Sequence, residues 1–341
     1  MIQTSWSAPS NIALIKYWGK HGIQLPNNPS ISFTLDKSRT HTHVKYEPGA
    51  SALDLQFLFE GKENIEFAKR TISFLNSINR ELPFLQTGKL YIESSNTFPH
   101  STGIASSASA MATLALCLCE IHQKVTDSYS DKIAFLKHAS HIARLGSGSA
   151  CRSIYPYLAQ WGQTDSIPSS SDEFAIPVSD VHVDFTTYLD AILIIDSDEK
   201  KVSSSAGHQL MEKNPLAEIR YKQAHTNLAE LLIALKTGDL DTFIEIVELE
   251  ALMLHALMMT SQPSYILIRP NTLQGIEKIQ LFRQETKIPV CFTLDAGPNI
   301  HLLYPKKYQT EVEAFISQQL IMLCEDERVI FDCCGEGPIS L

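Results

Sequence analysis

The chain has 341 residues, of which 44% are hydrophobic and 19% charged, and these proportions are typical of a soluble globular protein with two domains or one large one. A formal net charge of −10 argues against a broad nucleic-acid surface, and no apolar run reaches the roughly 18 to 20 residues that span a bilayer. The first ten residues do not resemble a signal peptide and the seven cysteines show no zinc-binding spacing, so we expect reduced thiols and a cytoplasmic protein without membrane or nucleic-acid partners.

The first segment that could carry chemistry is residues 8–20, with the sequence APSNIALIKYWGK. Its apolar residues predict a strand that ends with Lys16, Tyr17 and Lys20. The two lysine ammonium groups can reach a polyanion as point charges. In the alternative interpretation, both lysines are solvated ends of an edge strand.

A loop of small residues at 99–109, PHSTGIASSAS, lies between a predicted strand at 89–93 and a predicted helix with apolar residues from Met111 to Ile121 at spacings of three and four. Small residues let the backbone approach a ligand closely, and the free N–H groups of a first helical turn favour an anion such as phosphate. The alternative is a serine-rich turn that only caps the helix.

A second helix is predicted from Asp131, a plausible cap, to Gly146, a terminating glycine. The loop that follows, GSGSACRS at 146–153, is a second candidate anion site. Arg152 lies in it, and its planar guanidinium matches a carboxylate or phosphate with two bonds. The alternative is a flexible connection between helices with an exposed arginine.

The second half of the chain begins after a solvated loop at 168–173. We expect a domain boundary between residues 183 and 189, which gives domains of 1–185 and 186–341. Strands and helices are mixed without strict alternation, so the predicted class is α+β. The elements predicted in this half are strands at 189–195, 290–294 and 301–304, helices at 216–235, 240–259 and 310–323, and a further helix before residue 290.

Two polar segments of this half could also reach a site. Asp295, in the sequence TLDAGPN, ends an apolar strand and is a candidate acid–base group, although an aspartate at a strand end commonly forms a local turn with the backbone. Residues 201–208, KVSSSAGH, are either a polar loop over the site or a solvated turn.

Taken together, the motifs resemble the GHMP small-molecule kinase superfamily and, within it, the diphosphomevalonate decarboxylase family. NIALIKYWGK and GSGSACRS are specific to that family, PHSTGIASSASA matches the phosphate loop of the superfamily, and LDAGPN matches the aspartate motif. VSSSAG and the terminal GEGP at 335–338 fit more loosely. The matches run in the family's order from residue 8 to about residue 338.

The resemblance implies a ribosomal-protein-S5-like N-terminal domain, a ferredoxin-like C-terminal domain and a homodimer. It also implies ATP with Mg²⁺ in a cleft between the domains, and a substrate, mevalonate 5-diphosphate, that is converted to isopentenyl diphosphate. By position, the catalytic residues are Lys16, Arg152 and Asp295. The expected substrate contacts are Asn11, Tyr17, Lys20, Ser147, Ser149 and Arg152, and the expected nucleotide contacts are Gly103, Ala105, Ser106, Ser107 and Ser109, with Ser107 nearest the metal.

The sequence departs from the family pattern at 100–102, at Pro29 and at Pro156–Tyr157, where two glycines are usual; bulk there would narrow the pocket or move a strand. Two alternatives therefore stay open. One is a sibling enzyme, either a phosphomevalonate decarboxylase or a mevalonate 3-kinase. The other is a protein that kept the GHMP fold to bind ligands and lost turnover.

Overall fold

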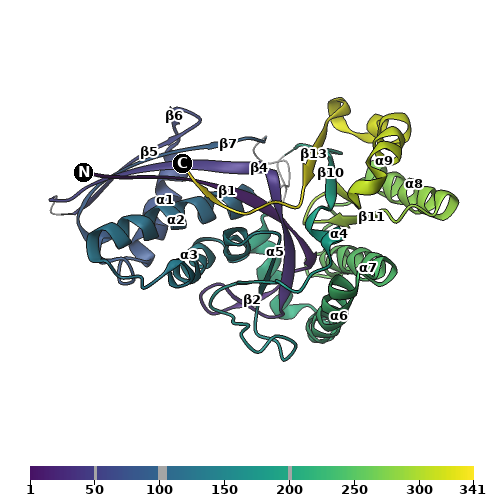
Figure 1. Ribbon diagram of the computed structural model, residues 1–341, viewed down its shortest axis with the longest axis horizontal. Coiled ribbons are helices and arrows are strands. Elements are labelled where there is room, and N and C mark those ends of the chain that lie inside the picture. Colours follow the sequence, from purple (N-terminus) through teal and green to yellow (C-terminus); the bar gives the residue numbers. More distant parts are fainter. Residues whose placement is uncertain (50–51, 99–105, 199–201) are drawn as a thin grey trace.

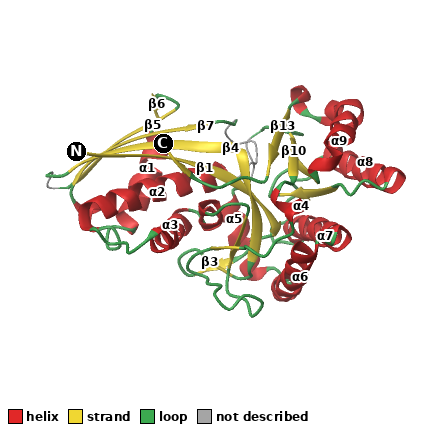
Figure 2. Ribbon diagram, in the orientation of Figure 1, coloured by secondary structure: helices red, strands yellow, loops and turns green. Residues whose placement is uncertain are grey.

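The computed structural model describes residues 1–49, 52–98, 106–198 and 202–341, and they form a mixed α+β protein, as predicted. Two large sheets lie one after the other along the longest axis of the molecule, and helices cover each of them (Figure 1; Figure 2); strands β2 (Lys20–His21) and β3 (Leu25–Pro26) form a small third sheet. No helix in these ranges is long and apolar enough to cross a membrane.

The first sheet is built on two long antiparallel strands, β1 (Ile2–Ile15) and β4 (Ser30–Glu47). Their register shifts between Pro9 and Asn11 and again between Ala13 and Ile15. Such irregularities bend a strand and re-aim its side chains. The remaining strands of this sheet are β5 (Leu53–Phe59), β6 (Lys62–Glu63), β7 (Gly88–Asn96), β8 (Leu158–Trp161), β9 (Ile176–Pro177) and β14 (Ile339–Ser340), in the order β14-β1-β4-β7-β5-β6 with β8 and β9 attached through β4.

Three helices pack on this sheet, namely α1 (Ile65–Ser77), α2 (Ser106–Thr126) and α3 (Lys132–Gly146) (Figure 1). Asp131 caps α3 as predicted, because its side chain accepts a hydrogen bond from the N–H of Ala134. Gly146 is the last residue of α3, but it does not end the helix as a glycine with a positive φ would. A Cβ at this position would lie 2.6 Å from Met111 Sδ of α2, so the glycine permits close packing of two helices.

The second sheet has the order β11-β12-β10-β13 and consists of β10 (Leu189–Leu193), β11 (Cys291–Leu294), β12 (Ile300–Tyr304) and β13 (Val329–Cys333). Successive side chains of a strand point to opposite faces, and apolar side chains pack on both faces here. Ile192 packs with the helix pair α6 (Ala217–Thr237) and α7 (Leu240–Met259), whereas Ala191 packs with α8 (Pro270–Thr286) and α9 (Gln309–Phe315). Smaller elements complete the fold: β2 (Lys20–His21), β3 (Leu25–Pro26), α4 (Val183–Thr186), α5 (Ser204–Leu210) and short turns of helix that include η1 (Pro83–Gln86) and η2 (Gly148–Ile154).

The predicted helices at 216–235 and 240–259 and the predicted strands at 89–93, 189–195, 290–294 and 301–304 are confirmed within a few residues. The predicted helix at 310–323 is only partly right, because regular α-helix ends at Phe315 and a wider turn (Ile316–Leu320) and a tighter turn (Ile321–Leu323) follow. The division of the chain into domains 1–185 and 186–341 stays a prediction.

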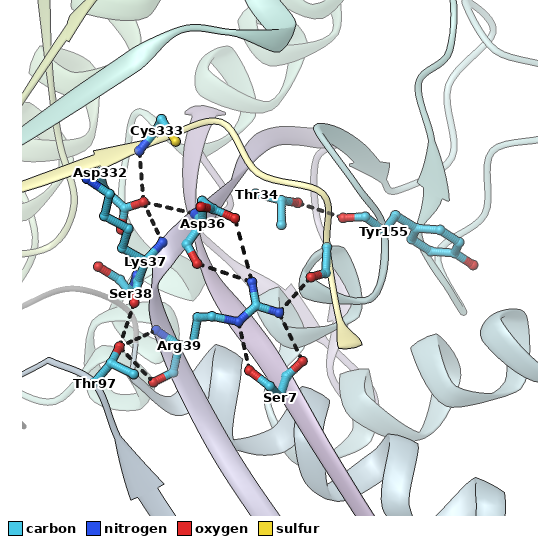
Figure 3. A network of polar contacts seen from close by, with 11 residues as sticks. Ser7, Thr34, Asp36, Lys37, Ser38, Arg39, Thr97, Tyr155, Asp332 and Cys333 are labelled. Atoms are coloured by element: carbon cyan, nitrogen blue, oxygen red, sulfur yellow. Dashed lines mark hydrogen bonds and ion pairs between the residues drawn. The ribbon is translucent and has the colours of Figure 1, made fainter. Parts of the chain in front are cut away.

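The end of the chain returns from the second sheet to the first, where β14 pairs with β1. The buried carboxylate of Asp332, at the end of β13, accepts hydrogen bonds from the backbone N–H groups of Asp36, Lys37 and Ser38 (Figure 3). Farther along, Arg39 donates to the carbonyl of Gly337 at 2.7 Å. These bonds connect the two sheets through the backbone of β4.

Pro156 and Tyr157 lie against this returning segment, and neither lines the cavity described below. The Tyr157 N–H donates to the Gly335 carbonyl, and Tyr157 has a φ of 56°, in the left-handed region that glycine adopts at least cost. The expectation that their bulk narrows the pocket is therefore wrong, because neither residue lines the cavity and Tyr157 packs against the hydrophobic core in a glycine-like backbone conformation.

Replacement of Asp332 by alanine removes the acceptor of the backbone N–H groups of Asp36, Lys37 and Ser38 at once, and the Ser38 bond is buried. We expect Asp332→Ala to lower the free energy of unfolding by about 3 kcal/mol, measured by chemical denaturation. Glu336→Ala is the matched control, because Glu336 is an exposed carboxylate in the same segment and its loss should change stability by no more than about 0.5 kcal/mol. Equal effects of the two variants would contradict this account of Asp332.

Candidate active site

A cavity of about 730 Å³ lies between the two halves of the molecule, and residues of both halves line it. Most of the residues singled out in the sequence converge on its wall, although they come from four distant segments of the chain. Those at the wall are Asn11, Lys16, Tyr17, Lys20, Ser106, Ser107, Ser147, Ser149, Arg152 and Asp295.

Lys16 follows β1 and is 1% exposed. Its Nζ donates to Oδ1 of Asp295 at 3.0 Å. Asp295 lies in the loop after β11, in the other half of the molecule. Burial lowers the pKa of the Lys16 ammonium, while the charge and hydrogen bond of Asp295 raise it. The interpretation of Lys16 as a solvated strand end is therefore wrong, and the pair forms a charged centre in the cavity wall.

The loop that carries Asp295 is held by one backbone hydrogen bond of its own and by contacts with α7 and with the segment after β10. The Asp295 carbonyl accepts from the N–H of Gly297 at 2.7 Å and lies 3.1 Å from Nε2 of His255 in α7. Asn299 accepts from the N–H of Ile195, at the end of β10. The tight turn thus forms through the Asp295 carbonyl, while the carboxylate reaches Lys16 across the cleft.

Arg152 is 2% exposed and belongs to η2. Its guanidinium donates to the hydroxyls of Ser32 at 2.9 Å and Ser30 at 2.6 Å, and to Oδ1 of Asn11 at 3.4 Å. These acceptors are neutral, and the ion pairs of the described residues do not include Arg152. A guanidinium held by neutral acceptors keeps its positive charge available for an anion in the cavity. The alternative interpretation of Arg152 as an exposed residue in a flexible connection is therefore wrong.

The ring of Tyr17 packs edge-on against Trp161, with ring centroids 4.7 Å apart, and at a tilt against His208, with ring centroids 4.3 Å apart. Its hydroxyl is buried without a hydrogen-bond partner among the described residues, and burial raises its pKa. A buried hydroxyl that lacks a partner costs free energy, so a polar ligand group is the natural acceptor or donor. The nearby Lys20 donates to the side chain of Gln24 at 2.8 Å.

The other predicted contacts are only partly assembled. Ser107 and Ser147 face each other with their hydroxyl oxygens 3.4 Å apart, where α2 begins and α3 ends. Ser109 is fully buried and bonds to the hydroxyl of Thr40, so its side chain packs α2 on the sheet and does not line the cavity. Gly103 and Ala105 lie outside the described residues.

His208 also lines the cavity, and it belongs to the segment 201–208, which the sequence predicts to be either a polar loop over the site or a solvated turn. Ser203 caps the helix α5, which replaces the expected polar loop, and His208 in that helix is 7% exposed. Its Nδ1 lies 2.9 Å from the backbone nitrogen of Gly19, and burial lowers its pKa to about 3. No periodic pattern marks His208 as an individual site residue. Four phenylalanines of β5 and α1 that were not predicted also line the cavity, namely Phe57, Phe59, Phe67 and Phe74. The alternation of phenylalanine along β5 is the sequence signal that could have identified the first two.

The cavity wall also offers an oxygen ligand that fits a magnesium ion. Mg²⁺ takes oxygen ligands and is usually held by few protein groups together with substrate phosphates and water. The Ser107 hydroxyl, at the first turn of α2, is an oxygen of that kind.

Two packed α+β halves, with a serine-rich helix start facing a cleft, define the GHMP kinase fold, and comparison with known proteins agrees. Residues 8–175 match the diphosphomevalonate decarboxylase-like N-terminal domain, and residues 191–335 match the mevalonate 5-diphosphate decarboxylase C-terminal domain. The chain belongs to the diphosphomevalonate decarboxylase family.

Individual relatives are similar over nearly the whole chain. Diphosphomevalonate decarboxylase of Ganoderma lucidum is 31% identical over 342 residues, which cover 92% of this chain and 81% of that protein. The crystal structure of mevalonate diphosphate decarboxylase from Staphylococcus aureus has a TM-score of 0.86 at 28% identity and covers 99% of this chain and 98% of that one. A structure of MDDEF in complex with MVAPP, AMPPCP and magnesium has a TM-score of 0.85 at 31% identity, and the match covers 100% of this chain and 99% of that one.

The depressed pKa of His208 predicts a pH-dependent stability. Below its ordinary value of 6.5 the unfolded chain binds a proton at this histidine, but the folded chain does so only near pH 3, so stability falls as pH decreases through this window. Between pH 7.5 and pH 5 we expect wild type to lose about 2 kcal/mol more than His208→Gln, whose amide oxygen can still accept from Gly19. Urea unfolding at both pH values measures this, and parallel losses in the two proteins would contradict it.

Proposed function

We propose that the protein catalyses the ATP-dependent decarboxylation of mevalonate 5-diphosphate to isopentenyl diphosphate, with release of ADP, phosphate and CO₂. The observation that carries the proposal is the Lys16–Asp295 pair in the wall of a cavity that also holds the guanidinium of Arg152. Family membership supports it, as does the similar structure that binds MVAPP and AMPPCP.

The first step is transfer of the γ-phosphoryl group of ATP to the tertiary hydroxyl of the substrate. A tertiary hydroxyl is a poor leaving group, and phosphorylation makes its departure possible. Asp295 holds this hydroxyl in line and takes its proton, while Lys16 keeps the carboxylate ionised at neutral pH. Phosphoryl transfer otherwise needs alignment and neutralisation of charge.

The second step is loss of phosphate and CO₂. The C–O bond to the new phosphate breaks, and positive character builds on the tertiary carbon. The bond to the neighbouring carboxylate then supplies the electron pair of the double bond. Arg152 orients that carboxylate with its planar fork, and the buried hydroxyls of Ser30 and Ser32 keep the guanidinium in place.

Binding of the substrate diphosphate is proposed for the part of the wall next to Lys16 and Arg152 in the sequence. Tyr17, Lys20, Ser147 and Ser149 supply hydroxyl and ammonium donors there, and Asn11 connects them to Arg152. Asn11 also donates to the carbonyl of Ser149 at 3.2 Å.

The nucleotide is proposed to bind along the start of α2. Ser106 and Ser107 line the cavity there, and Gly103 and Ala105 precede them in the sequence. Ser107 would hold the magnesium ion, which neutralises charge on the ATP phosphates when bound. A nucleotide contact by the Ser109 hydroxyl is not part of this proposal, since that group bonds to Thr40.

We also propose that the protein acts in the cytoplasm as a homodimer, as the family resemblance implies. All seven cysteines are free thiols, and six of them are buried, which suits a reducing compartment.

The proposed function is tested by product analysis with purified protein, ATP and Mg²⁺. We expect stoichiometric ADP, phosphate, CO₂ and isopentenyl diphosphate from mevalonate 5-diphosphate. A higher kcat/KM on mevalonate 5-phosphate would assign the monophosphate decarboxylase activity instead. ADP without CO₂ would identify a 3-kinase, and nucleotide binding without turnover would identify a binding protein.

Asp295→Asn keeps the size of the side chain but removes its charge and its basicity. We expect kcat to fall about 10²- to 10⁴-fold, with ADP and CO₂ formation lost together because phosphoryl transfer comes first. Asp196→Asn is the matched control: Asp196 pairs with Arg269 outside the cavity, and its loss should leave turnover near the wild-type value. Wild-type turnover in Asp295→Asn would rule out the proposed role.

A further inference from the structure

Glu250 of α7 and Arg220 of α6 form an ion pair whose side chains are both 0% exposed. The contact is bidentate, with Arg220 NH1 3.0 Å from Oε1 and NH2 2.6 Å from Oε2 of Glu250. Neither residue lines the cavity. Buried ion pairs are often no more stabilising than apolar side chains of the same volume, so stability alone does not account for this pair.

The same pair also binds the backbone of Lys16, which belongs to the other half of the molecule. The Lys16 N–H donates to Oε2 of Glu250 at 2.8 Å, and Arg220 NH2 donates to the Lys16 carbonyl at 3.1 Å. The side chain of Asn28 donates to the same carbonyl at 2.9 Å. Both backbone polar groups of Lys16 are therefore held at the point where β1 ends.

Fixing this backbone matters because the Lys16 ammonium stands at the end of a flexible four-carbon stem. The stem must place Nζ 3.0 Å from Asp295, across the junction of the two halves. Glu250 acts on the charge as well. Its carboxylate and that of Asp295 raise the pKa of Lys16, whereas burial and the neighbouring Arg152 lower it.

We propose that Glu250 and Arg220 are positioning residues that hold the Lys16 backbone so that its ammonium meets Asp295. As a statement about catalysis, this proposal rests on the proposed function. The pair connects α6 and α7 to the catalytic centre without touching substrate. A role confined to packing would affect unfolding and leave both the pKa of Lys16 and the rate of turnover unchanged.

The test uses the full chain, three variants that probe the proposal, and a fourth that assigns the NMR signal. Glu250→Gln removes the charge, and Arg220→Met combined with Glu250→Leu replaces the whole pair by apolar side chains that should still fold. Asn227→Ala is the matched control, because Asn227 donates to Oε1 of Glu250 at 2.6 Å and does not contact Lys16. The readouts are thermal unfolding, kcat, KM for ATP, and the pKa of Lys16 from NMR of ¹³Cε-labelled lysine, assigned with Lys16→Met.

In Glu250→Gln we expect the pKa of Lys16 to fall and kcat to drop at least about 10-fold, with KM for ATP within about twofold of wild type. The alkaline limb of the kcat profile should move to lower pH, since the protonated lysine is lost sooner. The double variant should fold and lose about 10²-fold in kcat. Asn227→Ala should melt at a lower temperature and keep both kcat and the pKa of Lys16.

A folded double variant with wild-type kcat would overturn the proposal, as would an unchanged pKa of Lys16 in Glu250→Gln. Failure of the proposed function is distinguishable from this result. If the wild type does not turn over mevalonate 5-diphosphate, the assignment of the reaction fails, while the NMR titration still decides whether Glu250 acts on Lys16.

Discussion

An ammonium group taken out of water is stable in a folded protein only beside a compensating negative charge. Lys16 is such a group, and Asp295, 279 positions later in the chain, supplies the compensating carboxylate. Neither partner is in place unless the two halves of the molecule are packed together. Formation of the cavity and formation of its charged centre are thus one event, because the contact that closes the junction also creates the reactive pair.

The same burial explains the chemistry that the site can support. Charges act strongly on one another where water is excluded, so the Lys16 ammonium and the Arg152 guanidinium exert more force on a bound anion than they would at a surface. Arg152 is held by neutral hydroxyls and an amide, and Tyr17 keeps a buried hydroxyl without a partner in the described structure. Arg152 therefore keeps its positive charge, and Tyr17 its hydroxyl, available to the polyanionic substrate that we propose.

Several bonds that are remote from the cavity keep the halves in register. The Asp332 carboxylate gathers the backbone N–H groups at residues 36–38, and Arg39 holds the returning segment through Gly337 (Figure 3). On the other side of the junction, Arg220 and Glu250 hold the end of β1. Strand β4 and the end of β1 are therefore each bonded to side chains of the second half.

Local features of this protein were determined by the sequence itself. Helical spacing of apolar residues predicted α6 and α7, a continuous apolar run at 189–195 predicted β10, and the residue type of Asp131 predicted the cap of α3. Each of these signals depends on residues that are close together in the sequence. Lys16, Arg152 and Asp295 were identified because the residues around each of them match a sequence motif of the family.

Only the tertiary structure decided how these residues meet. It buried Lys16, turned the Ser109 hydroxyl to Thr40, brought His208 to the cavity, and gave Pro156 and Tyr157 a place outside it. Distances between residues hundreds of positions apart follow from the packing of whole helices and sheets, and no local pattern encodes them. The sequence therefore specified the chemical groups of the site, and the fold specified their distances, their charge states and their partners.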